Sequence, residues 1–240
     1  REMMIQSSRL AERNHPSRNQ RLDLIRNGVY QAELSYDTAI VLHLIPFSAL
    51  FKKDSSNLDF SVITKNHNYI HPLNSNVRYS RYNLEGYVNF GHELAEGKKS
   101  GYVQIYRNGI IESVDTSIIR ASQDSEKRIS GGIFSRELVS KTRIYLDYQK
   151  RMGVIPPITL FVSLINIRGY YLAVNPNSVI NDLRKIPLER DSLLLPELIF
   201  DEYPNNLPIA MHSLLDRFWN AFGWERSLHY DGNGNWLGGY

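Results

Sequence analysis

The chain of 240 residues contains no cysteine, and this absence excludes several kinds of chemistry at once. Without thiols there is no disulfide, no cysteine nucleophile and no cysteine-ligated zinc or iron–sulfur site. The opening residues, Arg1 to Arg9, also lack the apolar stretch and the small-residue cleavage site of a secretory signal. We therefore expect a cytoplasmic protein.

Long hydrophobic runs are missing as well. A membrane-spanning helix needs about 20 consecutive apolar residues, whereas the longest clean runs here, 39–46 and 158–165, have the length of strands. No membrane span is therefore expected. The hydrophobic content of 42% is still sufficient for a globular protein with a real core.

The sequence has little net charge outside its opening segment. The whole chain carries a formal charge of +3, and residues 1–26 account for all of it with six arginines against three acidic residues. Because guanidinium groups make bidentate contacts with phosphates, the arginines of this segment are candidate nucleic-acid-binding residues. These candidates are Arg9, Arg13, Arg18, Arg21 and Arg26. The alternative interpretation is a solvated helix face.

Familiar catalytic signatures are also absent. The sequence has no nucleophile elbow, no P-loop and no dinucleotide-binding glycine pattern. His67 and His71 have the spacing of helical metal ligands, but Pro72 follows directly and indicates a loop. Glu96-Gly97-Lys98 matches part of a nuclease pattern, although its central glycine favours a turn, and 231–235 lacks the carboxylates of a calcium loop. We predict no metal site and no cofactor.

Hydrophobic patterns predict the main elements of the fold. Continuous apolar stretches predict central strands over 38–45 and 158–165. Asn108-Gly109 predicts a type I′ turn that joins strands 101–106 and 110–115 in a hairpin. Helical spacing of apolar residues predicts helices over 135–152 and 209–222. A further strand is expected within 79–90 and an edge strand within 193–200, whereas 51–76 is expected to be mostly loop.

These elements predict an α+β fold, with a mixed, largely antiparallel sheet packed against a few helices and preceded by an N-terminal connector helix. We expect residues 1–33 to form the arginine-rich connector and residues 34–240 to form the α+β domain. Because the chain opens on Arg1 rather than methionine, we also expect it to be a piece of a longer protein.

One histidine stands inside a predicted central strand. A buried imidazole needs partners for its ring nitrogens, so a structural role is the simpler interpretation of His43. The alternative is a functional site at the end of this strand, where His43 would face Arg190, Asp191 or Asp216. His43, Arg190 and Asp191 are therefore the predicted polar cluster.

Several segments of the sequence, taken in their order along the chain, resemble segments of a known group of proteins. They are Leu42 to Ser48, Gly101 to Glu112, Arg190 to Glu197, Phe218 to Ala221 and Asp231 to Trp236. In this order they resemble the C-terminal region of bacterial proteins that begin with a Schlafen-type AlbA domain and are labelled DNA-binding or ATP-binding. The resemblance covers residues 17–236, and it brings no catalytic residues with it.

The resemblance implies that the arginine-rich helix joins an AlbA domain to this domain. It further implies a bacterial protein that associates with nucleic acid, in regulation or defence, and whose nucleic-acid chemistry resides in the AlbA domain. The resulting hypothesis is a non-catalytic accessory domain that positions the AlbA domain or mediates assembly. One alternative is a metal-dependent nuclease that uses acidic residues among Glu85, Glu96, Glu112 and Asp115. The other is a pure homo-oligomerisation or protein-partner module.

Overall fold

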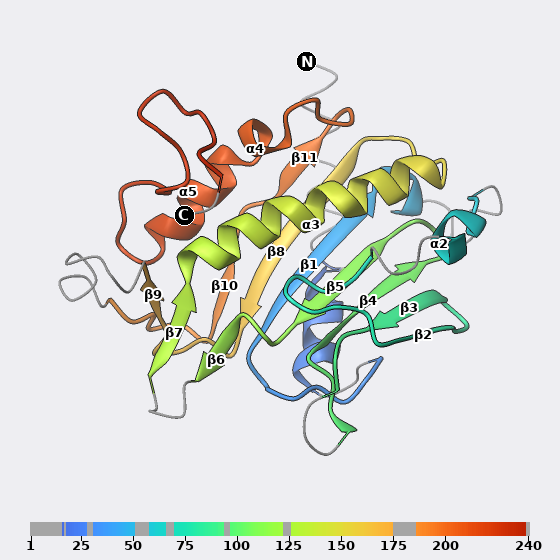
Figure 1. Cartoon of the computed structure of the whole chain (residues 1–240), viewed down its shortest axis with the longest axis horizontal. Helices are drawn as coiled ribbons and strands as arrows, with labels where there is room; N and C mark the ends of the chain where they lie inside the picture. The colour runs from blue at the N-terminus through green and yellow to red at the C-terminus, as the bar shows by residue number, and fades with distance from the viewer. Residues whose placement is uncertain are drawn as a thin grey trace.

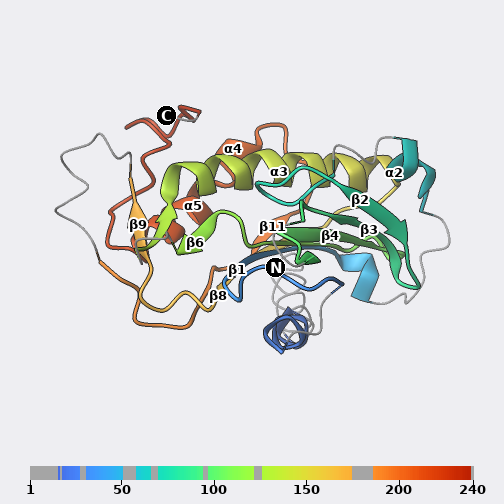
Figure 2. The same ribbon diagram turned by 60° about the horizontal axis from the view of Figure 1, so that its bottom comes forward.

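The structure is a computed structural model that describes residues 16, 18–27, 31–50, 58–65, 70–93, 97–121, 126–174 and 186–238. It confirms the predicted α+β class. Three layers are visible when the molecule is turned on its side, with one helix below the main sheet and the remaining large helix above it (Figure 2). The two helical layers explain why the middle strands are buried on both faces.

The main sheet has eight strands in the order β10-β8-β1-β5-β4-β3-β2, and β11 also pairs with β8 (Figure 1). All of its pairings are antiparallel. Its strands are β1 (Ala39–Pro46), β2 (Tyr79–Tyr82), β3 (Gly86–Phe90), β4 (Gly101–Tyr106), β5 (Ile111–Asp115), β8 (Ile158–Ile165), β10 (Ser192–Leu194) and β11 (Leu198–Phe200). A small mixed sheet contains β6 (Ile119–Ala121), β7 (Lys127–Ser130) and β9 (Tyr171–Ala173).

The two strands predicted to be central are the adjacent strands β1 and β8. Every residue of both is buried, as the continuous apolar runs require. Ile40, Leu42 and Leu44 face the larger core under α3, whereas Ala39 and Val41 face the smaller core on the other side. The sequence prediction is confirmed for both strands, although β1 lies one residue further along the chain than predicted, from Ala39 to Pro46.

The predicted hairpin is confirmed as β4 and β5, but its predicted turn type is wrong. The connection is a three-residue loop, in which the Tyr106 N–H donates to the Ile110 carbonyl (2.8 Å) and the Gly109 N–H to the Tyr106 carbonyl (2.9 Å). A type I′ turn needs positive φ at both central residues. Here Gly109 has φ +85°, whereas Asn108 is not in the left-handed region.

The long helix α3 (Gly131–Arg151) covers one face of the main sheet. It begins four residues earlier than predicted because Ser130 caps it, with the Ser130 hydroxyl accepting a hydrogen bond from the Ile133 N–H. The buried side chains of α3 include Phe134, Leu138 and Tyr145. The two glycines at 131 and 132 are therefore the first residues of the helix, rather than a break between it and the preceding strand.

The remaining predictions hold in outline and fail in detail. The predicted helix over 209–222 is two helices, α4 (Leu207–Ala210) and α5 (His212–Asn220). The stretch 79–90 contains the two strands β2 and β3 rather than one, and 193–200 contains β11 and the last two residues of β10. The predicted loop over 51–76 contains the short helix α2 (Ser61–Lys65), while 51–57 and the region of His67 lie outside the described residues.

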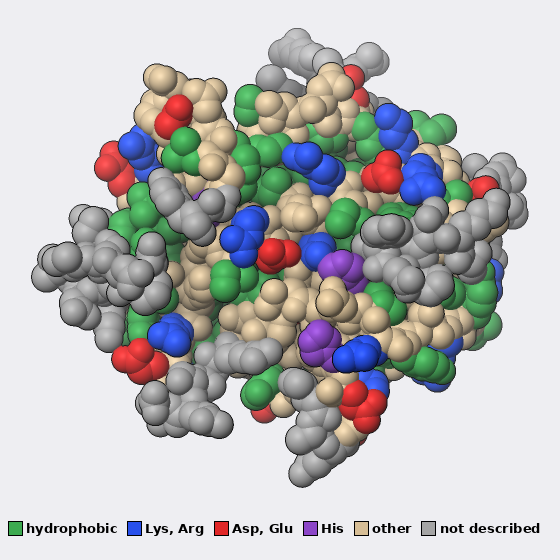
Figure 3. Space-filling view, in the orientation of Figure 1, with side chains coloured by type: hydrophobic (Ala, Val, Ile, Leu, Met, Phe, Trp, Pro, Cys, Tyr) green, Lys and Arg blue, Asp and Glu red, His purple; other side chains and the backbone are tan. Residues whose placement is uncertain are grey.

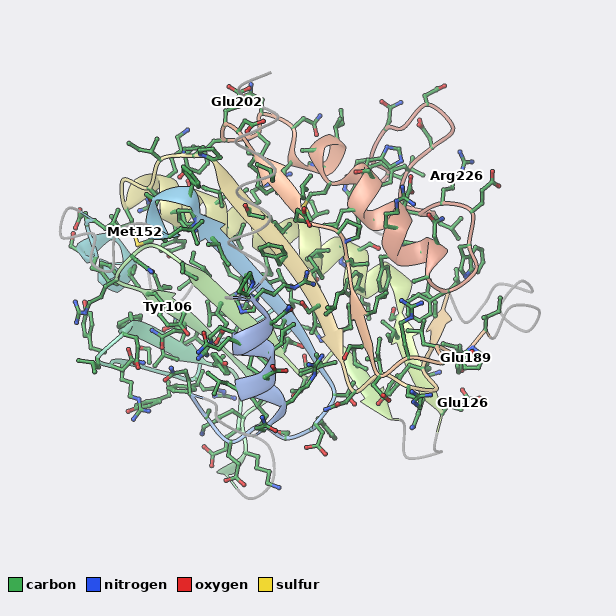
Figure 4. The ribbon with its side chains drawn as sticks, turned by 180° about the vertical axis from the view of Figure 1, so that it is seen from behind. Tyr106, Glu126, Met152, Glu189, Glu202 and Arg226 are labelled. Atoms are coloured by element: carbon green, nitrogen blue, oxygen red, sulfur yellow. The ribbon has the colours of Figure 1, made fainter. Side chains whose placement is uncertain are left out.

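The N-terminal helix, residues 18–26, lies on the face of the main sheet opposite α3. Figure 4, which views this face, shows the helix crossing the strands. Leu22 and Ile25 are buried from this helix and form the smaller core with Val41, Phe90 and Tyr102. The helix is thus packed as part of the folded unit. Within the described ranges, no helix is long and apolar enough to cross a membrane.

Candidate functional site

The N-terminal helix also covers a buried charged group on the sheet. Strand registry places Glu112 of β5 directly beside His43 of β1 and Gln104 of β4. Side chains of paired residues point to the same face of a sheet, and Val41 and Val114 place this face against the N-terminal helix. We call Arg21, His43, Tyr102, Tyr106 and Glu112 the Glu112 cluster.

Glu112 is the centre of the cluster and is 0% exposed. Its carboxylate accepts a bidentate pair from Arg21, with Nε–Oε2 at 2.8 Å and Nη2–Oε1 at 2.6 Å. His43 Nε2 lies 2.9 Å from Oε2, and the Tyr102 hydroxyl donates to Oε1 at 2.8 Å. Each carboxylate oxygen therefore has two partners, which is what a buried charge requires.

These contacts fix the charge of the carboxylate. Burial alone raises the pKa of Glu112, but hydrogen bonds from Arg21 and His43 more than offset it and lower the pKa to about 2. Burial acts to lower the pKa of Arg21, and Glu112 reverses this and raises it. The pKa of Tyr102 is raised by burial and by the adjacent carboxylate. At ordinary pH the cluster thus contains an ionised Glu112, a charged Arg21 and a neutral Tyr102.

Two polar atoms at the edge of the cluster make no hydrogen bond to any part of the chain that the structure describes. They are Nδ1 of His43 and the hydroxyl of Tyr106. Burial and the nearby Glu112 raise the pKa of Tyr106, so this hydroxyl stays protonated. A carboxylate–imidazole pair beside a phenol could move protons. However, His43 is only 2% exposed, so its ring is not accessible to a substrate in this structure.

Arg18 is the second arginine that the N-terminal helix directs into the protein. Its guanidinium donates to the Ser163 hydroxyl through Nε (3.1 Å) and Nη2 (2.9 Å), and to the Val162 carbonyl (3.1 Å). It also lies 4.9 Å from the centre of the Phe161 ring. Burial lowers the pKa of Arg18 to about 10, with Glu197 opposing the shift. Arg18 therefore remains charged at neutral pH.

These positions correct the sequence interpretation of Arg18 and Arg21 as part of a phosphate-contacting face. Both partners, Ser163 and Glu112, lie far along the chain, so the opening segment alone could not show that its arginines were already paired. Arg26 is exposed and contacts Asp23 (3.0 Å) and Ser192 (2.8 Å). Arg9 and Arg13 lie outside the described residues.

The structure does not bring together the predicted polar cluster of His43, Arg190 and Asp191. Both Arg190 and Asp191 are exposed, and Asp191 binds Arg168 through both carboxylate oxygens (2.7 and 3.1 Å). The Asp191 carbonyl accepts from the Ile167 N–H, whereas His43 pairs with Phe161. β8 ends at Ile165, which pairs with Ser192 next to Asp191, so Asp191 lies at least four strand positions, roughly 13 Å, from Phe161. The prediction is wrong because Asp191 lies beyond the far end of β8.

The acidic residues proposed for a nuclease are likewise separated. Glu112 and Asp115 lie on opposite faces of β5, because they are three positions apart on a strand whose side chains alternate between the two faces. Asp115 accepts backbone N–H groups from Asn74, Ser117 and Ile118 and so ties two loops together. Glu85 is exposed in the β2–β3 turn, and Glu96 is outside the described residues. Among described residues no group of three or more His, Asp or Glu is placed to hold a metal.

The face covered by α3 offers a different feature, a cleft of about 440 Å³ between α3 and residues 203–208. Arg143, Asp147 and Lys150 line one wall of it, and Tyr203 lies on the other. Figure 3 shows this side of the molecule, on which basic and acidic side chains are interspersed rather than gathered by sign. The cleft contains none of the predicted site residues.

Comparison of the chain with protein-family models, with curated proteins and with solved structures finds no match. The Glu112 cluster therefore stands on its geometry alone. One signal in the sequence points to it, since His43 and Glu112 are ionisable residues within two predicted apolar strands, and such residues must find partners when buried.

Proposed function

We propose that this chain is a non-catalytic accessory domain of a nucleic-acid-associated protein, and that it holds the polypeptide preceding residue 18 in a fixed orientation. The observation that carries the proposal is the docking of the N-terminal helix through Arg18 and Arg21. The resemblance to the C-terminal region of Schlafen/AlbA-type bacterial proteins supports it, because there this helix joins the domain to an AlbA domain.

The character of the docking supports positioning. Leu22 and Ile25 bury apolar surface, which gives affinity without a preferred direction. The bidentate Arg21–Glu112 pair adds a direction, because a guanidinium and a carboxylate match in one planar arrangement. Arg18 lies three residues before Arg21 in the same helix and donates to Ser163, which gives the helix a second anchor, on β8. Two anchors on different strands define both the axis and the rotation of the helix.

The absence of cysteine allows the positioning role to be tested by distance measurement. Spin labels on Asn19→Cys and Ser140→Cys, exposed on the N-terminal helix and on α3, report the distance across the three layers. We expect one narrow distance distribution in double electron–electron resonance. Replacing Arg18 and Arg21 together with Gln should broaden it, because both anchors are lost.

A matched control replaces Arg26, which is on the same helix but exposed, with Gln. This variant should keep the narrow distribution. Two results would contradict the positioning role. One is a broad distance distribution in the spin-labelled chain that keeps both arginines, and the other is an unchanged distribution when Arg18 and Arg21 are both replaced with Gln.

The non-catalytic part of the proposal predicts no cleavage by this chain of single-stranded DNA, duplex DNA or RNA with Mg²⁺ or Mn²⁺ present. The physical reason is that Glu112 and Asp115 are both saturated by protein donors and face opposite sides of β5. Reproducible cleavage that Glu112→Gln abolishes without unfolding the chain would favour the nuclease instead.

A further inference from the structure

The outer edge of the main sheet carries an unusual concentration of exposed hydrophobic side chains. Tyr79 and Tyr82 of β2 are 53% and 55% exposed, and Leu84 in the following turn is 88% exposed. β2 is the last strand of the sheet order. Edges are usually kept soluble by charge or by a covering segment, so large exposed aromatic rings at this place indicate an interaction surface.

The aromatic rings are held in place by the sheet beneath them. Tyr79 stacks on Phe90 with ring centres 5.6 Å apart and an interplanar angle of 17°. The Arg81 guanidinium carbon lies 5.6 Å from the centre of the same Phe90 ring. Because Phe90 is buried in the smaller core, it is a rigid support for both side chains. A ring that is already ordered loses little entropy when something stacks on its free face.

Tyr82 is supported in a different way on the other face of the strand. It meets Tyr87 of β3 edge to face, with ring centres 4.9 Å apart and an interplanar angle of 73°. Tyr87 belongs to the larger core under α3. The two exposed tyrosines therefore lie on opposite faces of one edge strand, three residues and roughly 10 Å apart along it.

The charge around these rings has one dominant sign. Arg78 and Arg81 are exposed beside the tyrosines, and Arg107 reaches the hairpin tip, where its Nε donates to the Leu84 carbonyl (3.2 Å). Within the described residues none of the three arginines forms an ion pair with a carboxylate. Glu85 is the one acidic residue in 78–85. Within the part of the chain that the structure describes, the surface thus presents guanidinium groups next to ring faces without a carboxylate partner.

We propose that this surface, Arg78, Tyr79, Arg81, Tyr82 and Arg107, binds single-stranded nucleic acid. Bases would stack on Tyr79 and Tyr82, and the arginines would contact the backbone phosphates, which is the combination used in binding single strands without sequence preference. Base pairs of a duplex are stacked on one another and offer no free face to Tyr79 or Tyr82. This inference goes beyond the positioning role and does not depend on it.

Fluorescence anisotropy with labelled 15-nucleotide dT and U oligomers tests the proposal at several KCl concentrations. Replacing Tyr79 and Tyr82 together with Ala should weaken binding at least about tenfold, because stacking is lost, with the salt dependence unchanged. Replacing Arg78 and Arg81 together with Gln should instead lower the log–log salt slope by about 1.4, at about 0.7 per phosphate contact on a single strand.

Three controls separate stacking from general charge and from unfolding. The Tyr79→Phe/Tyr82→Phe variant keeps the rings and should bind within about twofold of the parent. Tyr36→Ala removes a tyrosine that is 41% exposed elsewhere and should have no effect. Arg136→Gln/Arg151→Gln removes two exposed positive charges from α3 and should leave the slope unchanged.

Several outcomes would overturn the proposal. These are no binding by the parent chain, equal affinity for duplex and single strand, equal loss in the Tyr36 control, or a Tyr79/Tyr82 alanine variant that binds like the parent. Heparin, a polyanion without bases, should compete only weakly with the single-stranded oligomers for the chain. If heparin competes as well as an unlabelled oligomer does, charge alone would explain the binding. None of these results would alter the distance distribution that tests the positioning role.

Discussion

Replacing Glu112 with Ala is expected to lower the free energy of unfolding by about 3 to 5 kcal/mol, the usual cost of breaking a buried ion pair. The substitution removes the acceptor for Arg21, His43 and Tyr102 in one step. Arg21 would then keep a charge beneath the helix without its carboxylate, and the Tyr102 hydroxyl would lose its acceptor. Urea unfolding followed by circular dichroism measures the change.

A matched control is Asp147→Asn, which breaks the exposed pair with Arg151 and should cost about 0 to 1 kcal/mol. A second comparison is the double variant Arg21→Met/Glu112→Leu. Apolar replacement of a whole buried pair is often close to neutral, so this variant should recover much of the lost stability. If Glu112→Ala stays within about 1 kcal/mol of the parent, the cluster does not anchor the helix.

The central strands could be predicted because a strand that is buried on both faces is apolar at nearly every position of its sequence. In β1 and β8 each residue from Ala39 to Pro46 and from Ile158 to Ile165 is buried, so the apolar run itself encodes the structure. The turn at Asn108-Gly109 also pairs its own strands by local geometry. The predicted strand bounds left the three residues 107–109 in the loop, as observed, but the Asn-Gly pair by itself indicated the wrong turn type.

The Glu112 cluster could not be predicted as a whole, because its members meet only through the tertiary arrangement. His43 and Glu112 are neighbours because β1 lies between β5 and β8, an order that no local pattern specifies. Arg21 reaches Glu112 only after its helix has docked on the sheet. The surplus of arginine in the opening segment therefore suggested solvent-exposed side chains, although two of these arginines, Arg18 and Arg21, bind buried groups of the sheet.

On the edge strand β2 the sequence misleads in the opposite direction, because side chains of a type that usually packs inside a sheet are exposed. Tyrosine at alternating strand positions is typical of side chains that pack inside a sheet, and Tyr87 and Tyr102, which are 6% and 0% exposed, fit this description. Tyr79 and Tyr82 do not, because β2 is the last strand and has no neighbour to cover them in the described part of the chain. Strand order, rather than residue type, separates a core tyrosine from an exposed one.

Acid is expected to weaken the folded state through Glu112 in a defined pH window. The pKa of this carboxyl is about 4.5 in its ordinary state and about 2 in the folded protein. A carboxyl with a lowered folded pKa stabilises the fold above its unfolded pKa, and this stabilisation disappears as the pH falls to the folded pKa. The shift corresponds to about 3 kcal/mol, of which about 2 kcal/mol should be lost by pH of about 3.

Glu112→Gln isolates this contribution from those of the other acidic groups. Asp115, whose pKa burial raises, acts in the opposite direction, because a raised folded pKa favours the folded state as the pH falls. This effect is common to both proteins and cancels in their difference. The stability gap between parent and Glu112→Gln, measured by urea unfolding, should therefore narrow by about 2 kcal/mol between about pH 6 and about pH 3. A gap that stays constant over this range would mean that Glu112 titrates normally and that Arg21 does not hold it as a buried anion.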